Sequence, residues 1–160
     1  MKNTLQLTTP SDREIVFTRL FNAPRNLVFD AFTKPALIQR WLLGPPGWTM
    51  PVCEFDACVG GKFRYVWRNA EGHDMGMGGV IREFAPPERL VCTEMFDVDW
   101  TGGETLGTLV FTASDGQTTL TQTVLYSSRE ARDGALKTGM EQGMAFSYDR
   151  LEATLLSDSV

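Results

Sequence analysis

Along residues 14–21, EIVFTRLF, the side chains of Ile15, Phe17, Arg19 and Phe21 alternate with those of Val16, Thr18 and Leu20. Most of them are β-branched or aromatic. A two-residue period with this composition predicts a strand. Apolar residues then recur with helical spacing behind Pro24 and again behind Pro35, before the sequence GPPG. Proline is well tolerated in the first turn of a helix, and a Gly-Pro cluster ends one. We therefore expect two short helices after the first strand.

Between residues 48 and 128 the pattern changes to short alternating segments that tight turns separate. The connections VGG, AEGHD, APPE, WTGGE and SDGQ carry the glycine, proline or aspartate that such turns require. Links of this length join antiparallel neighbours in a sheet. The pattern predicts strands over residues 49–56, 62–69, 75–84, 89–97, 105–112 and 118–126.

The last part of the chain returns to a helical period. Apolar residues from Met140 to Leu155 are spaced by three or four positions, and charged residues fall between them. This spacing predicts one long amphipathic helix. We expect an α+β fold over residues 1–160, a single domain whose core spans about 13–156. In it, a curved antiparallel sheet of seven strands wraps around the C-terminal helix.

The glycines at the start of VGGKFRYVWR raise the question of a phosphate-binding loop. A Walker loop needs Ser or Thr after its lysine and a helix that begins there, whereas Lys62 is followed by Phe63 and a strand pattern. We therefore expect Gly60 and Gly61 to form a turn or bulge at the start of a strand.

The side chains of this strand divide by chemistry between its two faces. Phe63, Tyr65 and Trp67 share one face, and a lysine and two arginines share the other. Because cations and aromatic rings lie on opposite sides, they do not form a surface on which nucleic-acid bases could stack. We expect the aromatic face to be buried and the cationic face to be solvated.

Composition narrows the classes of partner. A net charge of -5 and a pI near 4.9 oppose binding to nucleic acid and to anionic membranes. No apolar run reaches the roughly 18 residues of a membrane span, and the N-terminus lacks the pattern of a signal peptide. We expect a cytoplasmic protein with no nucleic-acid partner and no membrane span.

Metal-binding and catalytic residues are not evident. Cys53, Cys58 and Cys92 fit no zinc spacing, and His73 is the single histidine, in a predicted hairpin. We expect three reduced cysteines, a solvated His73, no metal and no cofactor, and we name no catalytic residue. A shift of one residue in strand register exchanges the two faces of a sheet. The sequence therefore does not decide whether the polar atoms of the following residues point inward: Asp56, Tyr65, Glu83, Glu94, Gln122 and Tyr148.

Four segments together resemble a known family. They are TRLFNAPRNLVFDAFTKPALIQRW, EFDACVGGKFRYVWR, GGVIREFAPPERLVCTE and GMAFSYDRLEATL, in this order. They resemble signatures of the START-like SRPBCC superfamily. The most similar subgroup is the one named after the activator of the heat shock protein 90 ATPase, in its C-terminal-type domain. The resemblance implies a helix-grip fold, as in START and birch-pollen-allergen proteins, with a cavity between sheet and C-terminal helix that holds lipids, hormones or polyketides.

One residue departs from the family pattern. Where the family often has Gly-Trp in the last helix, this chain has Gly143-Met144, so the shape of the pocket is not carried over. Large or adaptable side chains on the elements that would surround a cavity are the candidates for ligand contact. They are Trp41, Trp48, Phe63, Tyr65, Trp67, Met75, Met77, Phe111, Met140, Met144 and Tyr148.

Three functions follow as hypotheses. The first is binding of a small apolar or amphipathic molecule without catalysis; a homodimer is left open. The second is a chaperone-interacting module, but only about a dozen residues precede the first predicted strand, where the activator has a further domain, so we do not expect stimulation of the ATPase. The third is a cyclase or hydrolase, which would need two or more buried ionisable side chains within hydrogen-bond reach of each other.

Overall fold

The computed structural model describes residues 4–98 and 102–158. One antiparallel sheet has the strand order β1-β2-β8-β7-β6-β5-β4-β3. Its strands are β1 (Gln6–Thr8), β2 (Glu14–Phe21), β3 (Thr49–Phe55), β4 (Lys62–Arg68), β5 (Asp74–Ala85), β6 (Arg89–Phe96), β7 (Thr105–Ser114) and β8 (Gln117–Leu125). The helices are α1 (Arg25–Thr33), α2 (Pro35–Trp41), α3 (Arg129–Leu136) and α4 (Met140–Asp158).

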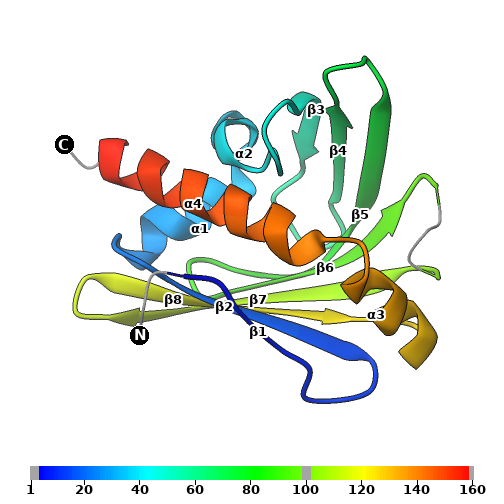
Figure 1. The fold of residues 1–160 in the computed structure, drawn as a ribbon. Coiled ribbons are helices and arrows are strands. Elements are labelled where there is room, and N and C mark those ends of the chain that lie inside the picture. Colours follow the sequence, from blue (N-terminus) through cyan, green and yellow to red (C-terminus); the bar gives the residue numbers. More distant parts are fainter. Residues whose placement is uncertain (1–3, 99–101, 159–160) are drawn as a thin grey trace.

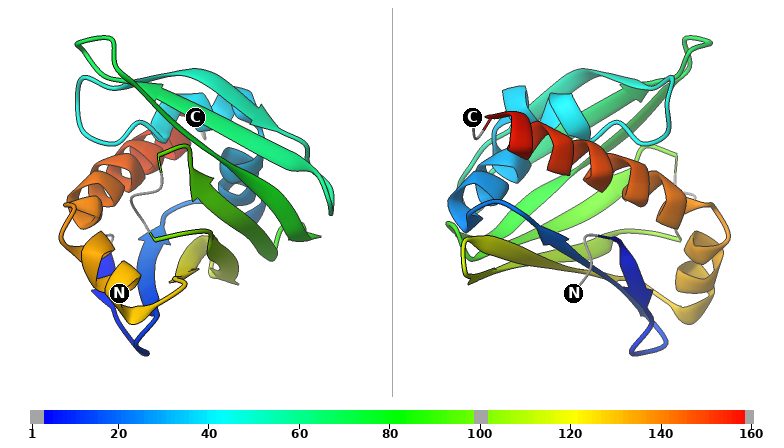
Figure 2. Two further views of the ribbon diagram at one scale, coloured as in Figure 1. Left: turned by 90° about the vertical axis from the view of Figure 1, so that its right-hand side faces the viewer. Right: turned by 60° about the vertical axis from the view of Figure 1, so that its left-hand side comes forward.

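The sheet curves around the long C-terminal helix. In Figure 1 the β3–β5 end turns up beside α4, while β1, β2, β7 and β8 pass below it. Both views in Figure 2 show α4 lying along the concave side of the sheet, with α1 and α2 near its C-terminal end. The expected α+β helix-grip fold is thus confirmed. No helix in the described ranges is both long and apolar enough to cross a membrane.

Two elements were not expected from the sequence. The sheet has eight strands rather than seven, because Gln6–Thr8 pairs with β2 through Leu7 and Phe17. Three residues are too few to show a two-residue period. The helix α3 was also missed, although Ser128 is an N-cap whose side chain accepts a hydrogen bond from the Ala131 amide at 3.1 Å.

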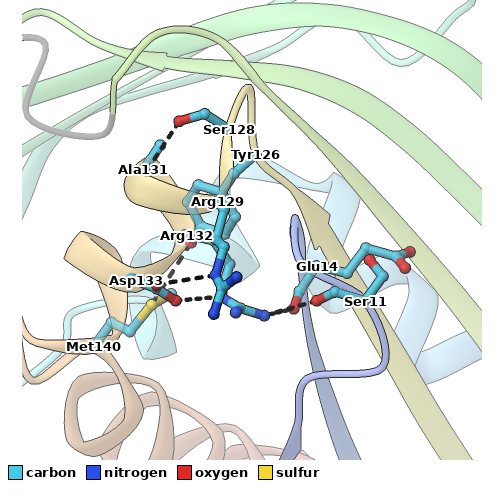
Figure 3. Close-up of polar contacts among 9 residues, drawn as sticks. All are labelled: Ser11, Glu14, Tyr126, Ser128, Arg129, Ala131, Arg132, Asp133 and Met140. Carbon is cyan, nitrogen blue, oxygen red and sulfur yellow. Dashed lines mark hydrogen bonds and ion pairs between the residues drawn. The ribbon is translucent and has the colours of Figure 1, made fainter.

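The buried Arg132 of α3 joins this helix to the loop before β2, as Figure 3 shows. Its guanidinium donates to the Ser11 carbonyl at 2.7 Å and to the Glu14 carbonyl at 3.4 Å. At the start of α4, the Tyr126 hydroxyl contacts the sulfur of Met140 at 3.7 Å. These contacts hold the beginning of α4 against the β2–β8 part of the sheet.

The turn before β4 confirms the expectation for the double glycine. Gly60 has a φ of 85°, which favours glycine. Its amide donates to the Ile81 carbonyl at 2.8 Å, and the Ile81 amide returns a bond of 2.8 Å to the Gly61 carbonyl. Along β4, the aromatic side chains are buried and the lysine and arginines point to the other face. The segment is a strand start and no phosphate loop.

The outer face of β5 contains a gap that an ion pair fills. Arg64 on β4 and Asp97 after β6 form two hydrogen bonds of 2.6 Å across this strand. A side chain at Gly76 would overlap Asp97 and lie 2.6 Å from the Arg64 guanidinium. Gly76 of β5 therefore provides room for this cross-strand contact on the outer face.

Candidate ligand-binding site

Two groups of packed aromatic rings lie on the concave side of the sheet. The first aromatic group joins side chains of α1, α2 and α4 to side chains of the sheet and consists of Phe21, Phe29, Phe32, Trp41, Phe84, Phe111 and Tyr148, mostly in edge-to-face contacts. The second aromatic group lies on β3 and β4 and consists of Phe55, Phe63, Tyr65 and Trp67. Offset and edge-to-face geometries of this kind add to the energy of burial.

Three of the expected ligand-contact residues belong to the first aromatic group. Trp41, Phe111 and Tyr148 are almost completely buried. The Trp41 indole donates to the Ala31 carbonyl at 2.8 Å, and its ring centroid lies 5.8 Å from that of Tyr148. These side chains form the packed core between α4 and the sheet.

The second aromatic group holds three more, Phe63, Tyr65 and Trp67, all buried on one face of β4. Met77 of β5 pairs with Tyr65, and Met75 pairs with Trp67, so both methionines share this face. Met77 is buried, whereas Met75 is 37% exposed. The structure therefore places a continuous apolar wall on β4 and β5, with Met75 at its accessible end.

The remaining three expected residues are half-buried. Trp48 precedes β3 and packs against the main apolar core, while Met140 packs against a smaller apolar cluster around Ile15 and Phe17. Met144 contacts both clusters. Of the α4 methionines, Met144 is thus the one that faces the middle of the concave side.

An acidic residue lies among these apolar side chains. Glu94 of β6 is opposite Thr105 of β7, and it shares its face with Cys92, which pairs with the buried Ile81. A side chain at Gly107 would overlap the Glu94 carboxylate oxygen Oε1. The carboxylate therefore lies across β7 on the concave face, in space that Gly107 leaves open.

No side chain in the described ranges forms a hydrogen bond or ion pair with the Glu94 carboxyl, and because no buried side-chain oxygen there lacks a partner, its oxygens keep contact with solvent. The residue is half-buried, and this partial burial raises its pKa to about 7. The pKa values of Tyr148, Tyr126 and Cys92 are raised first by their own burial and then by the charge of Glu94. Burial also raises the pKa of Tyr65, with a smaller contribution from Glu94.

The other polar groups of the concave face are already paired. The Tyr148 hydroxyl donates to Oε1 of Gln122 on β8. Arg19 of β2 is buried, and its guanidinium binds Asp149 of α4 at 2.8 Å and lies over the Phe21 ring at 5.1 Å. The charge of Arg19 is thus compensated, whereas the charge of Glu94 is not.

Of the six residues whose polar atoms could point inward according to the sequence, four lie on this face: Tyr65, Glu94, Gln122 and Tyr148. Asp56 and Glu83 are exposed, and Glu83 pairs with Arg89 at 2.6 Å. The alternation in LVCTEMF places Glu94 with Leu90 and Cys92 on one face, and an acid at an apolar position was the signal that could have singled it out.

Two depressions of the described surface lie away from α4. One, of about 340 Å³, is bordered by the Arg64–Asp97 pair, Val66, Met75 and Phe96. The other, of about 150 Å³, lies at the rim formed by Arg13, Glu104 and Tyr126. On the concave face itself, accessible surface remains at Glu94, Leu109, Gln122 and Met144, which are all half-buried.

A curved antiparallel sheet around a long C-terminal helix, with aromatic walls and a carboxyl between them, defines a helix-grip protein of the SRPBCC type. The family model described as activator of Hsp90 ATPase homolog 1-like protein matches residues 22–156. The chain belongs to this family.

Solved structures of similar proteins share the whole fold. A protein from Rhodobacter sphaeroides is 36% identical, with a TM-score of 0.91 over 96% of this chain and 99% of that one. A protein from Staphylococcus epidermidis is 28% identical, with a TM-score of 0.81 over 96% and 94% of the two chains. A Nitrosomonas europaea protein, 21% identical, has a TM-score of 0.83 over 94% and 99% and supports the fold alone. No curated protein matches the chain.

Proposed function

We propose that this protein binds a small amphipathic molecule between the sheet and α4. Glu94 carries the proposal, because an acidic side chain that no described residue pairs with, on a largely apolar concave face, is costly unless a ligand contacts it. Glu94, Leu109, Gln122 and Met144 keep accessible surface on this face. The apolar part of the ligand packs on the second aromatic group and Met144, and its polar end meets Glu94.

Burial of apolar surface is sufficient for useful affinity. A ligand that buries about 300 Å² of apolar area gains roughly 7 kcal/mol before the costs of ordering. One polar contact then selects its orientation. Micromolar binding is therefore expected without a second charged group.

The proposal is for binding rather than catalysis. A cyclase or hydrolase would need a second ionisable group beside Glu94, and within residues 4–98 and 102–158 no hydrogen bond joins Glu94 to one. We also propose a cytoplasmic location, because Cys53, Cys58 and Cys92 are all unpaired, as is usual in a reducing compartment.

A screen with lipids and aromatic metabolites, read by thermal shift and native mass spectrometry, tests the binding function. At least one compound should raise the melting temperature and form a complex of defined mass. Met144→Trp should lower its affinity by about tenfold, since an indole is larger than a thioether and would occupy the middle of the concave face. Gln142→Trp is the control, because residue 142 is exposed on the same helix. Unchanged binding to the Met144 variant would contradict this location.

The family description supports one alternative, an interaction with the heat shock protein 90 chaperone. A pull-down with the chaperone and an ATPase assay separate the two functions. We expect no stimulation of the ATPase at high molar excess of this protein. Stimulation that Met144→Trp leaves intact would favour the chaperone function over the ligand-binding one.

A further inference from the structure

The charges around Glu94 indicate which polar group the ligand carries. On the same face, Glu94 has Cys92 beside it on β6 and Thr105 opposite it on β7. Its charge acts on the tyrosines Tyr65 of β4, Tyr126 directly after β8 and Tyr148 of α4. At neutral pH all of these side chains are uncharged, since burial raises the pKa values of the tyrosines and of Cys92. Within residues 4–98 and 102–158, the groups named here around Glu94 therefore include no cation.

Cations of the neighbouring elements have other partners, and Arg13, before β2, donates to the Tyr126 carbonyl at 2.9 Å. Arg19 acts on Tyr148, but its guanidinium binds Asp149 and the Leu20 carbonyl. Arg132 of α3 binds Asp133 and the carbonyls before β2, as Figure 3 shows. The inner side chains of β5, Met77 and Ile81, cannot be charged. In the part of the chain that the structure describes, the concave face thus carries an acid with no base paired to it.

We propose that the ligand carries a protonated amine that pairs with the carboxylate of Glu94, an inference that rests on the binding function proposed above. An ionised carboxylate only accepts hydrogen bonds, and a bond from a cationic donor is roughly twice as strong as one from a neutral donor. An amine also compensates the buried charge, whereas an alcohol leaves it uncompensated and a carboxylate adds a like charge. The amine is therefore the polar group that this face selects.

Gly107 makes this geometry available. The carboxylate oxygen Oε1 occupies the position that a side chain at residue 107 would take. Gly107→Ala should displace the carboxylate and weaken binding of the amine without removing the acid. Gly107→Ala therefore tests whether binding of the amine depends on the position of the Glu94 carboxylate, because the variant keeps the acid and changes only where it lies.

A matched series of phenylbutylamine, phenylbutanol and phenylbutanoate tests the inference by titration calorimetry. These probes share one apolar frame and differ in the end group. At about pH 8 the amine should bind about tenfold more tightly than the alcohol, and the carboxylate most weakly. At about pH 5.5, where Glu94 is protonated, the advantage of the amine should largely disappear.

Glu94→Gln should abolish both the preference for the amine over phenylbutanol and the pH dependence of this preference. Glu104→Gln, which removes an exposed carboxylate, should retain the preference. Equal binding of amine and alcohol to the wild type, or a preference that survives Glu94→Gln, overturns the amine inference and leaves the binding function standing. Failure of all three probes and of the wider screen overturns the binding function together with the inference.

Discussion

Replacing Glu94 by Gln should raise the free energy of unfolding by about 1 to 3 kcal/mol at pH 8. Burial raises the pKa of this carboxyl from an ordinary value near 4.5 to about 7 in the folded protein. Between these two values the folded state binds more protons than the unfolded state, so stability falls as the pH rises. Above pH 7 the cost of the buried charge is fully present, and the amide of glutamine does not carry it. Because Glu94 keeps some contact with solvent, the effect is smaller than the whole shift would give.

Urea denaturation of both proteins from about pH 4 to pH 8 measures this difference. The two stability curves should coincide near pH 4, where Glu94 is protonated in both states, and diverge as the pH rises. The exposed Glu104→Gln variant should follow the wild-type curve over the same range. A constant difference between wild type and Glu94→Gln at every pH would show that packing, and not charge, distinguishes them.

Gly79→Ala should destabilise the protein by about 3 kcal/mol or more, or prevent its folding. A side chain at residue 79 would overlap the Thr93 carbonyl oxygen and lie 2.8 Å from the Phe63 ring. The carbonyl belongs to the backbone of β6, and Gly79 itself pairs with Phe63 of β4. Since β5 is hydrogen-bonded on both sides, it cannot move away from one neighbour without losing pairing with the other.

Gly134→Ala is the matched control for this substitution. Nothing lies within 4 Å of the position of its new side chain, and the residue is in α3, where alanine is favoured over glycine by up to about 1 kcal/mol. Urea midpoints and circular dichroism compare the two variants. The control should be as stable as the wild type or more so. A Gly79→Ala protein with the wild-type midpoint would mean that β5 and β6 are not packed as closely as described.

Much of the fold could be predicted from local patterns. Residues 14–21 alternate in composition, and they form β2 with these bounds. Pro35 opens α2 as its composition suggested, while Pro24 caps α1 rather than beginning it. The sequence pattern does not predict β1 and α3. The strand β1 is stabilised by its pairing with β2, and the short helix α3 is stabilised by the contacts of Arg132. Short elements depend on contacts with distant residues, which a local pattern does not contain.

The candidate site was predicted less completely. The buried face of β4 followed from the two-residue alternation of its side chains. The placement of Met144 and Tyr148 on α4 followed from the helical spacing of three or four residues. Eleven apolar or aromatic residues were named as ligand contacts, and their role stays a prediction. Glu94 stays one of several polar candidates at the level of sequence, because an error of one residue in strand register exchanges the two faces of a sheet.

The sequence by itself determined the order of the longer elements, the antiparallel sheet with its long C-terminal helix and the chemistry of each strand face. These features depend on periods of two and of three to four residues, which are local properties of the chain. Only the tertiary structure decided that the Glu94 carboxylate lies over Gly107, that its charge acts on Tyr65, Tyr126 and Tyr148, and that no cation of the described residues pairs with it. That arrangement needs β4, β6, β7, β8 and α4 in one register, and the burial that raises the pKa of Glu94 exists only when all of them are packed.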